Sequence, residues 1–482
     1  MTLDWLALLQ FWGPVVLAAL TGIAAALHAL LNKRNPSAAL GWVAVCLLFP
    51  PVGPVLYALF GINRVRMRAR RLEARAAHSL GPREAGVQSE PALVDPALPA
   101  LFTGLANAGD RLAGCPLVGG NEVTPLINGE GAFPPMLEAI EKARRYIYLT
   151  TYIFETNRIG RRFIDTLAAA VERGVDVRVL IDGVGDYYAL PRRRASVLLR
   201  KRGVRVARFL PPRLLPPSLG INLRNHRKIL VADGEVAFTG GMNIGDRHFA
   251  DNRRRRRVED LHFAFRGPVV NQIEAIFLGD WAFVTGQQTE PTPPTRTDRG
   301  DALCRAVDDG PTEDTDRLAA LLSAAVASAR QRVLIMTPYF LPSPELVGAL
   351  QSAALRGLDV SIVLPAHNNL PYVHWASRHG LRDLLVRGVK VYYRPPPFAH
   401  TKLFVIDDAY AVLGSANIDP RSLRLNFELA VEVYDTALVP RLAEHIVDTL
   451  ARSSRYTLAD DRGRSLPVRL RDSMAWLLSP YL

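Results

Sequence analysis

The sequence predicts an α/β protein in which two equivalent half-domains follow an apolar N-terminal hairpin. Three observations lead to this prediction. A short polar motif occurs twice at a constant offset of 174 residues, the segments around both copies alternate between strand and helix patterns, and residues 6–60 are strongly apolar. Strands that alternate with helices form a sheet covered by helices on both faces. The duplication then implies two such halves related by a pseudo-two-fold axis.

The length of the chain, 482 residues, exceeds what one hydrophobic core usually holds and suggests about three units. We expect a membrane anchor of two helices at 1–62, a linker at 63–110, a first half at 111–288, a linker at 289–303 and a second half at 304–482. The three cysteines lie far apart, which predicts neither a disulfide framework nor a zinc site and fits a reducing compartment.

The anchor is expected to contain two apolar segments. Leu6–Leu31 is long enough to cross a bilayer as a helix. No Lys or Arg precedes it, and it is longer than the apolar part of a signal peptide, so we expect it to be retained. The second segment, 38–60, holds three prolines and a glycine within 50–54. It is either a kinked span or a helix that enters the membrane and turns back.

The basic residues around the anchor predict its orientation. Five arginines follow within residues 64–71, against only Lys33 and Arg34 between the two apolar segments. The excess of cations in short segments marks the cytoplasmic side of a membrane protein. We therefore expect a multi-pass protein of the inner (cytoplasmic) membrane, with everything after Phe60 in the cytoplasm.

The chain is basic, with a net charge of +13 and arginine-rich runs at 192–194, 200–202 and 253–257. A charge run is often only a solvated face. Beside a membrane anchor, however, these runs are expected to meet anionic lipid, where each cation contributes about 1 kcal/mol. Nucleic acid is the competing polyanion, but a nucleic-acid enzyme does not need the apolar hairpin, so no nucleic-acid partner is expected.

After the anchor, the same order of elements occurs twice: helix, strand, helix, strand. The first series covers 135–145, 146–154, 161–173 and 175–181, and the second covers 316–329, 333–340, 344–356 and 360–364. A polar, proline-containing segment at 285–300 joins the halves.

The duplicated motif has the form H-x-K-x4-D-x6-G-[GS]-x-N. Its first copy holds His226, Lys228, Asp233 and Asn243, and its second copy holds His400, Lys402, Asp407 and Asn417. Residues two apart on an extended strand share a face, so each histidine projects together with its lysine. Two histidines and two lysines in one place are suited to a phosphate group.

The remaining motif positions allow more than one role. Asp233 and Asp407 follow strand-like segments and are either turn formers or carboxylates that orient the site, and both roles can hold at once. Glycine at 240 and 414 lets the backbone approach a ligand closely. Asn243 and Asn417 are expected to donate amide hydrogen bonds to phosphate oxygens.

These residues resemble the H-K-D signature of the phospholipase D superfamily, and further segments resemble the bacterial cardiolipin synthases. Those segments are Lys33–Pro36, Thr337–Phe340, Trp375–Arg378, Asp419–Leu423, Asn426–Glu428 and Leu477–Pro480. The resemblance covers nearly the whole chain. It departs from the family at Glu259, where arginine is usual, and at 366–370, which lacks an acidic residue. It implies two phospholipase-D-like halves with the site at their seam.

The resemblance also implies a two-step phosphatidyl transfer through a phosphohistidine. His226 would be the nucleophile and His400 the general acid and base, and the two lysines would balance the phosphoryl charge. Asp260 and Glu428 would be the carboxylates that hold the opposite imidazoles, unless they are ordinary surface carboxylates. No cofactor and no metal ion are expected.

The expected reaction joins two phosphatidylglycerol molecules into cardiolipin and releases glycerol, at the bacterial inner membrane with the catalytic halves facing the cytoplasm. The expected partners are phosphatidylglycerol and anionic membrane lipid, and a homo-oligomer is left open. One alternative is a phospholipase-D-type hydrolase or a membrane-bound nuclease of the superfamily. Another is a catalytically dead scaffold that binds anionic lipid, although both motifs retain His, Lys, Asp and Asn.

Overall fold

The computed structural model describes residues 5–33, 36–61, 102–212, 223–250, 257–291, 299–310 and 316–479. The chain divides into two compact units, Met1–Arg70 and Arg71–Leu482. The arginines of 64–71 and the run at 253–257, apart from Arg257, lie outside the described residues.

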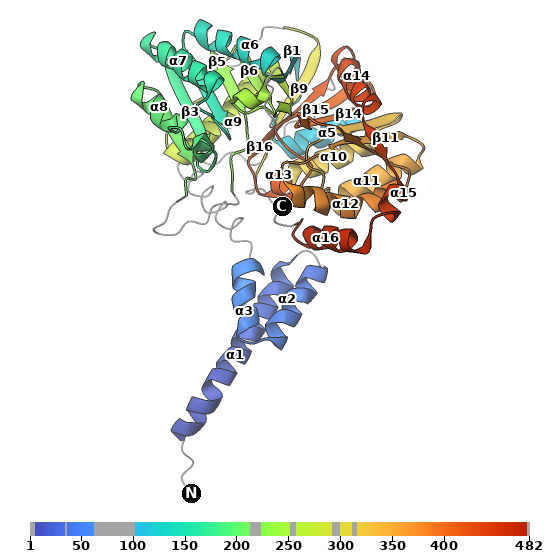
Figure 1. The fold of residues 1–482 in the computed structure, drawn as a ribbon. Helices are drawn as coiled ribbons and strands as arrows, with labels where there is room; N and C mark the ends of the chain where they lie inside the picture. The colour runs from blue at the N-terminus through green and yellow to red at the C-terminus, as the bar shows by residue number, and fades with distance from the viewer. Residues whose placement is uncertain are drawn as a thin grey trace. The chain divides into compact units, whose positions relative to one another are not determined.

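The N-terminal unit is helical. It contains α1 (Trp5–Asn32), α2 (Pro36–Leu48), α3 (Val52–Leu56) and a π-helical turn at Tyr57–Gly61 (Figure 1). Within the described residues one segment, Phe11–Asn32, is long and apolar enough to cross a membrane, with a mean hydropathy of 2.0. At 13 residues, α2 is about 20 Å long, which is shorter than the hydrocarbon core of about 30 Å. α3 then packs against α1 and α2, so the chain folds back on itself within the second apolar segment.

Close backbone approach holds this hairpin together. A Cβ atom at Gly53 would lie 2.1 Å from the carbonyl oxygen of Val45, and one at Gly22 would lie 2.9 Å from that of Cys46. Small residues allow helices to approach in this way. His28 Nδ1 also lies 2.8 Å from the Tyr57 hydroxyl, which joins α1 to the end of the second segment.

The second unit contains both halves. The first half consists of β1 (Val118–Ile127), α6 (Asn128–Lys142), β2 (Tyr146–Thr151), α7 (Arg158–Glu172), β3 (Asp176–Asp182), η3 (Gly185–Ala189), α8 (Ala195–Lys201), β4 (Arg205–Phe209), β5 (Ile229–Ala232), β6 (Val236–Gly240), η5 (Asp246–His248), β7 (Val258–Glu259), β8 (Leu261–Arg266) and α9 (Val269–Thr285). Both predicted helices and both predicted strands of this half are confirmed, with shifted ends.

The second half repeats this order. It consists of α5 (Thr103–Ala113), β9 (Ala302–Asp309), α10 (Arg317–Ser328), β10 (Arg332–Met336), α11 (Pro344–Leu355), β11 (Asp359–Pro365), α12 (Pro371–Val386), β12 (Lys390–Arg394), β13 (Phe398–Ala399), β14 (Leu403–Ile406), β15 (Tyr410–Gly414), α13 (Pro420–Arg424), β16 (Glu428–Tyr434), α14 (Leu438–Ala451), β17 (Ser454–Tyr456), α15 (Leu458–Arg462) and α16 (Leu466–Leu477). Residues 103–110, expected in a linker, instead belong to α5, which packs on α10 and β9.

One 15-stranded sheet runs through both halves and shows the pseudo-two-fold directly. Reading outward from the antiparallel β1–β9 pair, one half has the order β1-β8-β6-β5-β2-β3-β4 and the other β9-β16-β15-β14-β10-β11-β12-β17. Gly240 pairs with His262 on β8, and Gly414 pairs with Ala430 on β16. This register makes Asp260 and Glu428 equivalent positions, each two residues before the paired residue.

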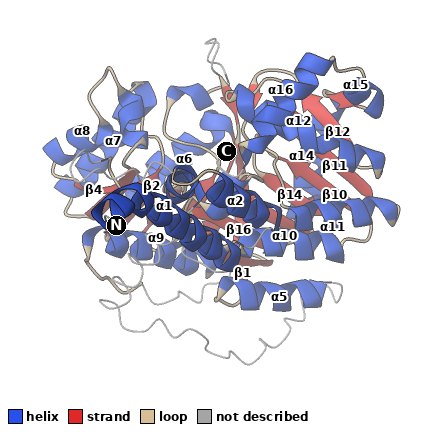
Figure 2. Cartoon of the chain, turned by 90° about the horizontal axis from the view of Figure 1, so that it is seen from below, coloured by secondary structure: helices blue, strands red, loops and turns tan. Residues whose placement is uncertain are grey.

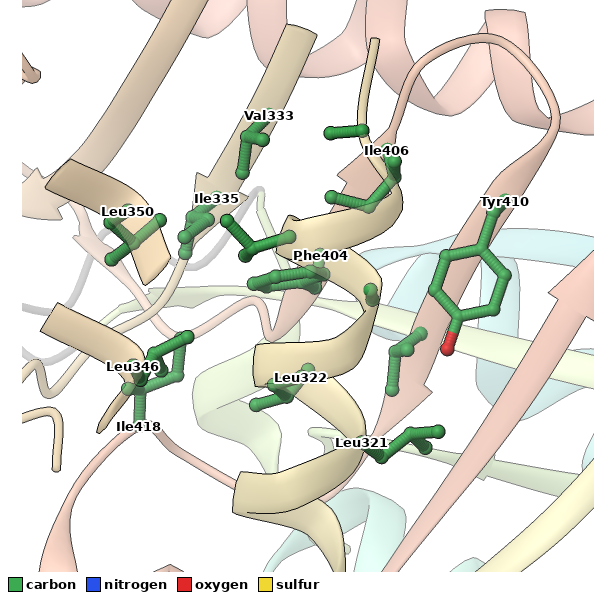
Figure 3. Packing of buried hydrophobic residues seen from close by; sticks show 14 of the residues in the cluster. Leu321, Leu322, Val333, Ile335, Leu346, Leu350, Phe404, Ile406, Tyr410 and Ile418 are labelled. Carbon is green, nitrogen blue, oxygen red and sulfur yellow. The ribbon is translucent and has the colours of Figure 1, made fainter. Parts of the chain in front are cut away.

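Helices cover both faces of the sheet (Figure 2). In the first half, side chains of α6, α7 and α8 form one core with the strands, and α9 packs on β2, β5, β6 and β8. In the second half, α10, α11 and α12 form the corresponding core, and α14 packs on β10, β11, β12 and β14. Leu321, Leu322 and Phe404 show this packing between α10 and β14 (Figure 3). The motif strands β5 and β14 are therefore buried in the middle of each half.

Candidate active site

Each motif histidine is tied by its backbone to the other half. The His226 N–H donates to the carbonyl of Phe427 (2.9 Å), and the His400 N–H donates to the carbonyl of Glu259 (2.8 Å). Beside them, Asn225 bridges to Phe427 and β13 pairs in parallel with β7. Each half thus pairs, through its backbone, with the segment of the other half that precedes the motif lysine. This pairing places both histidines at the seam between the halves.

Each motif histidine also contacts a carboxylate of the opposite half. His226 Nδ1 lies 3.0 Å from Glu428 Oε1, and His400 Nδ1 lies 2.7 Å from Asp260 Oδ2. Both carboxylates are fully buried, whereas the imidazoles keep 14% and 13% of their side-chain surface exposed. A carboxylate on Nδ1 fixes the ring orientation and favours the tautomer whose Nε2 is unprotonated. Each half therefore orients the imidazole of the other and leaves Nε2 for a reacting group.

The two carboxylates have different surroundings. Glu428 also accepts hydrogen bonds from the Ser415 hydroxyl (2.5 Å) and the Asn426 amide (3.1 Å). Burial alone would raise its pKa, but the interactions with His226, the Lys228 ammonium and the Ser415 hydroxyl lower the pKa of Glu428 overall. At Asp260, burial dominates and raises the pKa. Donors aimed at a carboxylate favour its ionised form, so Glu428 is the more strongly held anion.

The imidazoles are held neutral in the free protein. Burial lowers the pKa of His226. Burial and the adjacent Lys402 ammonium lower the pKa of His400 well below its ordinary value. A neutral imidazole is the form that can act as a nucleophile or accept a proton.

Both lysines are buried beside the histidines. Lys228 Nζ donates to the His226 carbonyl (2.5 Å) and Lys402 Nζ to the His400 carbonyl (2.6 Å). Lys402 Nζ also lies 2.9 Å and 3.0 Å from the two ring nitrogens of His400. Burial lowers the pKa of Lys228 to about 7 and that of Lys402 to about 8. A phosphate anion bound beside these two buried ammonium groups would stabilise their protonated forms.

The two motif asparagines are not equivalent. Asn243 uses its side-chain oxygen to accept the Ile153 N–H (3.1 Å), which leaves its Nδ2 group as the part suited to a phosphate oxygen. Asn417 donates Nδ2 to the Ser422 hydroxyl (3.1 Å), so one of its two amide hydrogens is already used. The expectation that both donate to phosphate fits Asn243 better than Asn417.

The motif aspartates do not contact the histidines, and of the two roles expected for them the structure shows that of turn formers. Asp233 and Asp407 lie at the far end of β5 and β14 from the lysines, at positive φ angles of 54° and 50°. Asp233 accepts the N–H groups of residues 144–146, and Asp407 accepts those of residues 330–332. They are turn formers that fix the start of β2 and β10, since aspartate tolerates left-handed backbone and accepts hydrogen bonds locally.

A buried ionic network behind His226 was not anticipated. Arg227 donates Nε to the Glu428 carbonyl (2.9 Å) and forms an ion pair with Asp280. The other Asp280 oxygen accepts the Asn225 amide (2.9 Å), and Asp182 accepts the Asn225 N–H (3.0 Å). The network holds the His226 segment against the Glu428 strand. The second motif has Ala399 and Thr401 at the positions equivalent to Asn225 and Arg227. The network is therefore not repeated, and the duplication could not reveal it.

Two further histidines lie behind the Asp260 side of the site. His248 Nε2 accepts the Asn243 N–H (3.3 Å). Burial lowers the pKa of His248 to about 3 and that of His262 to about 4, so both are neutral. Among the described residues, no group of three or more His, Cys, Asp or Glu side chains could hold a metal ion.

Comparison with known proteins identifies relatives of the whole chain. The family described as "Cardiolipin synthase, PLD-like domain" matches residues 136–281 and 322–450, and "Phospholipase_D-nuclease N-terminal" matches residues 22–61. The chain is 33% identical over 476 residues to a cardiolipin synthase of Geobacillus kaustophilus, covering 97% of this chain and 93% of that one. It is 32% identical to cardiolipin synthase A of Pseudomonas putida, covering 96% of each.

A solved structure shows the same fold. A phosphatidylserine synthase of Haemophilus influenzae superposes with a TM-score of 0.62 at 15% sequence identity, covering 79% of this chain and all of that one. At this identity the likeness establishes the two-half architecture only.

Proposed function

The chain belongs to the cardiolipin synthase family of phospholipase-D-like phosphatidyltransferases, and on that basis we propose that it joins two phosphatidylglycerol molecules into cardiolipin and glycerol. One observation supports the chemistry above all others: His226 and His400 lie at one seam, and each is held by a carboxylate of the opposite half. Because each histidine depends on a carboxylate of the other half, neither half can form this site alone.

In the first step, His226 Nε2 attacks the phosphorus of one phosphatidylglycerol. A P–N bond forms, and the P–O bond to the headgroup glycerol breaks. His400 donates a proton to the departing oxygen, and glycerol leaves. Lys228 and Lys402 balance the charge that builds on the phosphoryl oxygens, and Glu428 balances the positive charge of the phosphohistidine ring.

In the second step, His400 is neutral and accepts the proton of a terminal headgroup hydroxyl on a second phosphatidylglycerol. The hydroxyl oxygen attacks phosphorus, the P–N bond to His226 breaks, and cardiolipin leaves. A lipid alcohol competes well with water here because the membrane raises its local concentration.

The surroundings of the two histidines support His226 as the nucleophile. Its partner Glu428 accepts hydrogen bonds from Ser415 and Asn426, which favour the ionised carboxylate. The imidazole that becomes cationic in the intermediate therefore lies next to an anion. His400 instead lies against the Lys402 ammonium. An anionic phosphodiester beside Lys402 offsets that charge and raises the pKa of His400, so substrate binding loads the general acid with its proton.

Product analysis tests this function. Purified full-length protein is incubated with phosphatidylglycerol in mixed micelles containing excess chelator, and the lipids are identified by mass. Cardiolipin with an equal amount of glycerol is expected, because lysines supply the positive charge at the phosphate. Phosphatidic acid alone would mean a hydrolase, no turnover would mean a lipid-binding scaffold, and turnover restored only by a divalent cation would contradict the metal-free chemistry.

The dependence of kcat/KM on pH follows from the lysines. Lys228 and Lys402 must be protonated to act, and their pKa values are about 7 and about 8. Each loses its charge as pH rises through its pKa, so kcat/KM is expected to fall between about pH 7 and pH 9. Rates measured on micellar substrate across this range, with protein folding checked at each pH, provide the test. A profile that stays flat to pH 9 would contradict the assignment.

The protein associates with the membrane, and we place its catalytic halves on the cytoplasmic side. The arginines within residues 64–71 support this orientation. A membrane-impermeant thiol reagent added to intact cells should not label a cysteine placed at Leu355 on α11. Labelling there would reverse the orientation.

A further inference from the structure

The C-terminal helix α16 carries an apolar stripe that faces outward. Leu466, Leu470, Met474 and Leu477 are 65%, 56%, 68% and 69% exposed. Their spacing of four, four and three residues places them along one face of the helix. Four large apolar side chains in a continuous row are more than the scattered exposure that a soluble surface normally shows.

The opposite face of α16 is already packed. Asp472 and Ala475 are buried, and α16 lies along α12 (Figure 1). The Asp472 carboxylate accepts from Arg378 (2.9 Å), Arg464 (2.8 Å) and Arg471 (2.8 Å). A buried carboxylate with three guanidinium partners holds the helix in one orientation. The packed face fixes the orientation of α16, and the apolar stripe therefore points outward.

Within α16, the charges that flank the stripe are positive. Arg469 and Arg471 lie on its two sides, each one residue from Leu470 along the chain. Asp472 is the only acidic residue of α16, and it is buried and paired. Arg462 and Arg464 precede the helix together with Asp460 and Asp461, of which Asp461 is buried and pairs with Arg464. An apolar face between arginines is complementary to a surface in which anionic groups lie above a hydrocarbon layer.

We propose that α16 lies in the headgroup layer of an anionic bilayer, with Leu466, Leu470, Met474 and Leu477 reaching the acyl-chain boundary. An amphipathic helix with basic flanks binds membranes in this manner. A second copy of the chain is a poorer occupant, because an isologous contact would bring Arg469 and Arg471 against their own copies. The inference goes beyond the proposed reaction, and a catalytically inactive variant should contact lipid in the same way.

Label quenching tests the contact in full-length protein reconstituted into vesicles. A fluorophore on Met474→Cys should be quenched by nitroxide-bearing lipids in vesicles that contain phosphatidylglycerol. The matched control is Leu355→Cys, which is equally exposed (65%) on α11 and should not be quenched. Unmodified protein carries the buried Cys46 and Cys304 and the half-buried Cys115, so its own labelling is subtracted.

The results of two kinds of measurement would overturn the proposal. One is equal quenching at the two positions, or none at position 474. The other is energy transfer between position-474 labels on different copies that rises with protein density, which would assign the stripe to a second copy. Repeating the measurement in His226→Ala separates this proposal from the proposed function, because quenching should persist without turnover.

Activity gives an independent readout. The double variant Leu470→Ser/Met474→Ser should lose several-fold activity on phosphatidylglycerol in vesicles and keep its activity on micellar substrate. Leu355→Ser should change neither. An equal loss on both substrates would point to a structural role of the stripe, and unchanged activity on vesicles would mean that the helix does not position the site; either result contradicts the proposal.

Discussion

His226→Ala is expected to form no phosphoenzyme, whereas His400→Ala is expected to form it and then stall. The structure gives the two histidines equivalent mountings, since each Nδ1 is held by a buried carboxylate of the other half, but covalent catalysis requires them to differ. Without His226 there is no nitrogen to attack phosphorus. Without His400 the leaving oxygen receives no proton and the acceptor hydroxyl is not activated, a role worth about 10²–10⁴-fold.

An activated phosphatidyl substrate, whose leaving group needs no proton, separates the two roles. With it, acid-labile and base-stable label on histidine should accumulate in His400→Ala and be absent from His226→Ala. His374→Ala, which changes a histidine of α12 packed beside Tyr393, should behave as the unchanged protein. Label in His226→Ala but not in His400→Ala would exchange the roles.

Lys228→Met and Lys402→Met are each expected to lower kcat by about 10²–10³-fold, the cost of removing one donor that stabilises transition-state charge. Methionine keeps the length of the side chain and removes its charge. Each ammonium group donates to the carbonyl of its own motif histidine and so lies close to the proposed reaction centre. The loss should therefore fall mainly on kcat. Lys390→Met, on an exposed lysine of β12 paired with Asp359, is the matched control.

Steady-state kinetics on micellar phosphatidylglycerol, with circular dichroism to confirm folding, measure this effect. A rise in KM with unchanged kcat would mean that the lysines only bind the lipid headgroup. Such a result would contradict their role in the transition state while leaving the histidine chemistry intact.

The architecture could be predicted because the sequence repeats. His226 and His400 recur at the same offset as the strands β5 and β14 that follow them, so one observation predicted both halves and their pseudo-two-fold axis. The strands β2, β3, β10 and β11 were predicted because they are short apolar runs between amphipathic helices. Helix α6 begins at Asn128, well before the expected start at 135, and both Pro134 and Pro135 lie within the helix.

The site could be predicted only in part. The family resemblance led us to expect Asp260 and Glu428 as the carboxylates that hold the opposite imidazoles, and both contacts are present. Their distances from the motif asparagines differ, and only the strand pairing at Gly240 and Gly414 shows that the two positions are equivalent. The role of Asp233 depends on N–H groups of residues 144–146, nearly ninety positions away. Arg227 and Asp280 form an ion pair that occurs in one half only, so no repeat revealed it.

The N-terminal hairpin shows a different limit. Prolines within 50–54 are compatible with a kink or with a return, because both leave backbone groups that need new partners. The choice depends on contacts that hydropathy does not report, among them the approach of Gly53 to Val45 and the contact between His28 and Tyr57.

The stereochemical course at phosphorus tests the central claim most directly. The claim is that one site, built by both halves, transfers the phosphatidyl group twice, first to a histidine and then to the acceptor lipid. Phosphatidylglycerol carrying a phosphorothioate of single configuration would be converted by the full-length protein, and the configuration of the product determined. Each in-line displacement inverts the centre, so two in succession should give cardiolipin with retained configuration. Inversion would mean direct attack of one lipid on the other and would contradict a covalent intermediate.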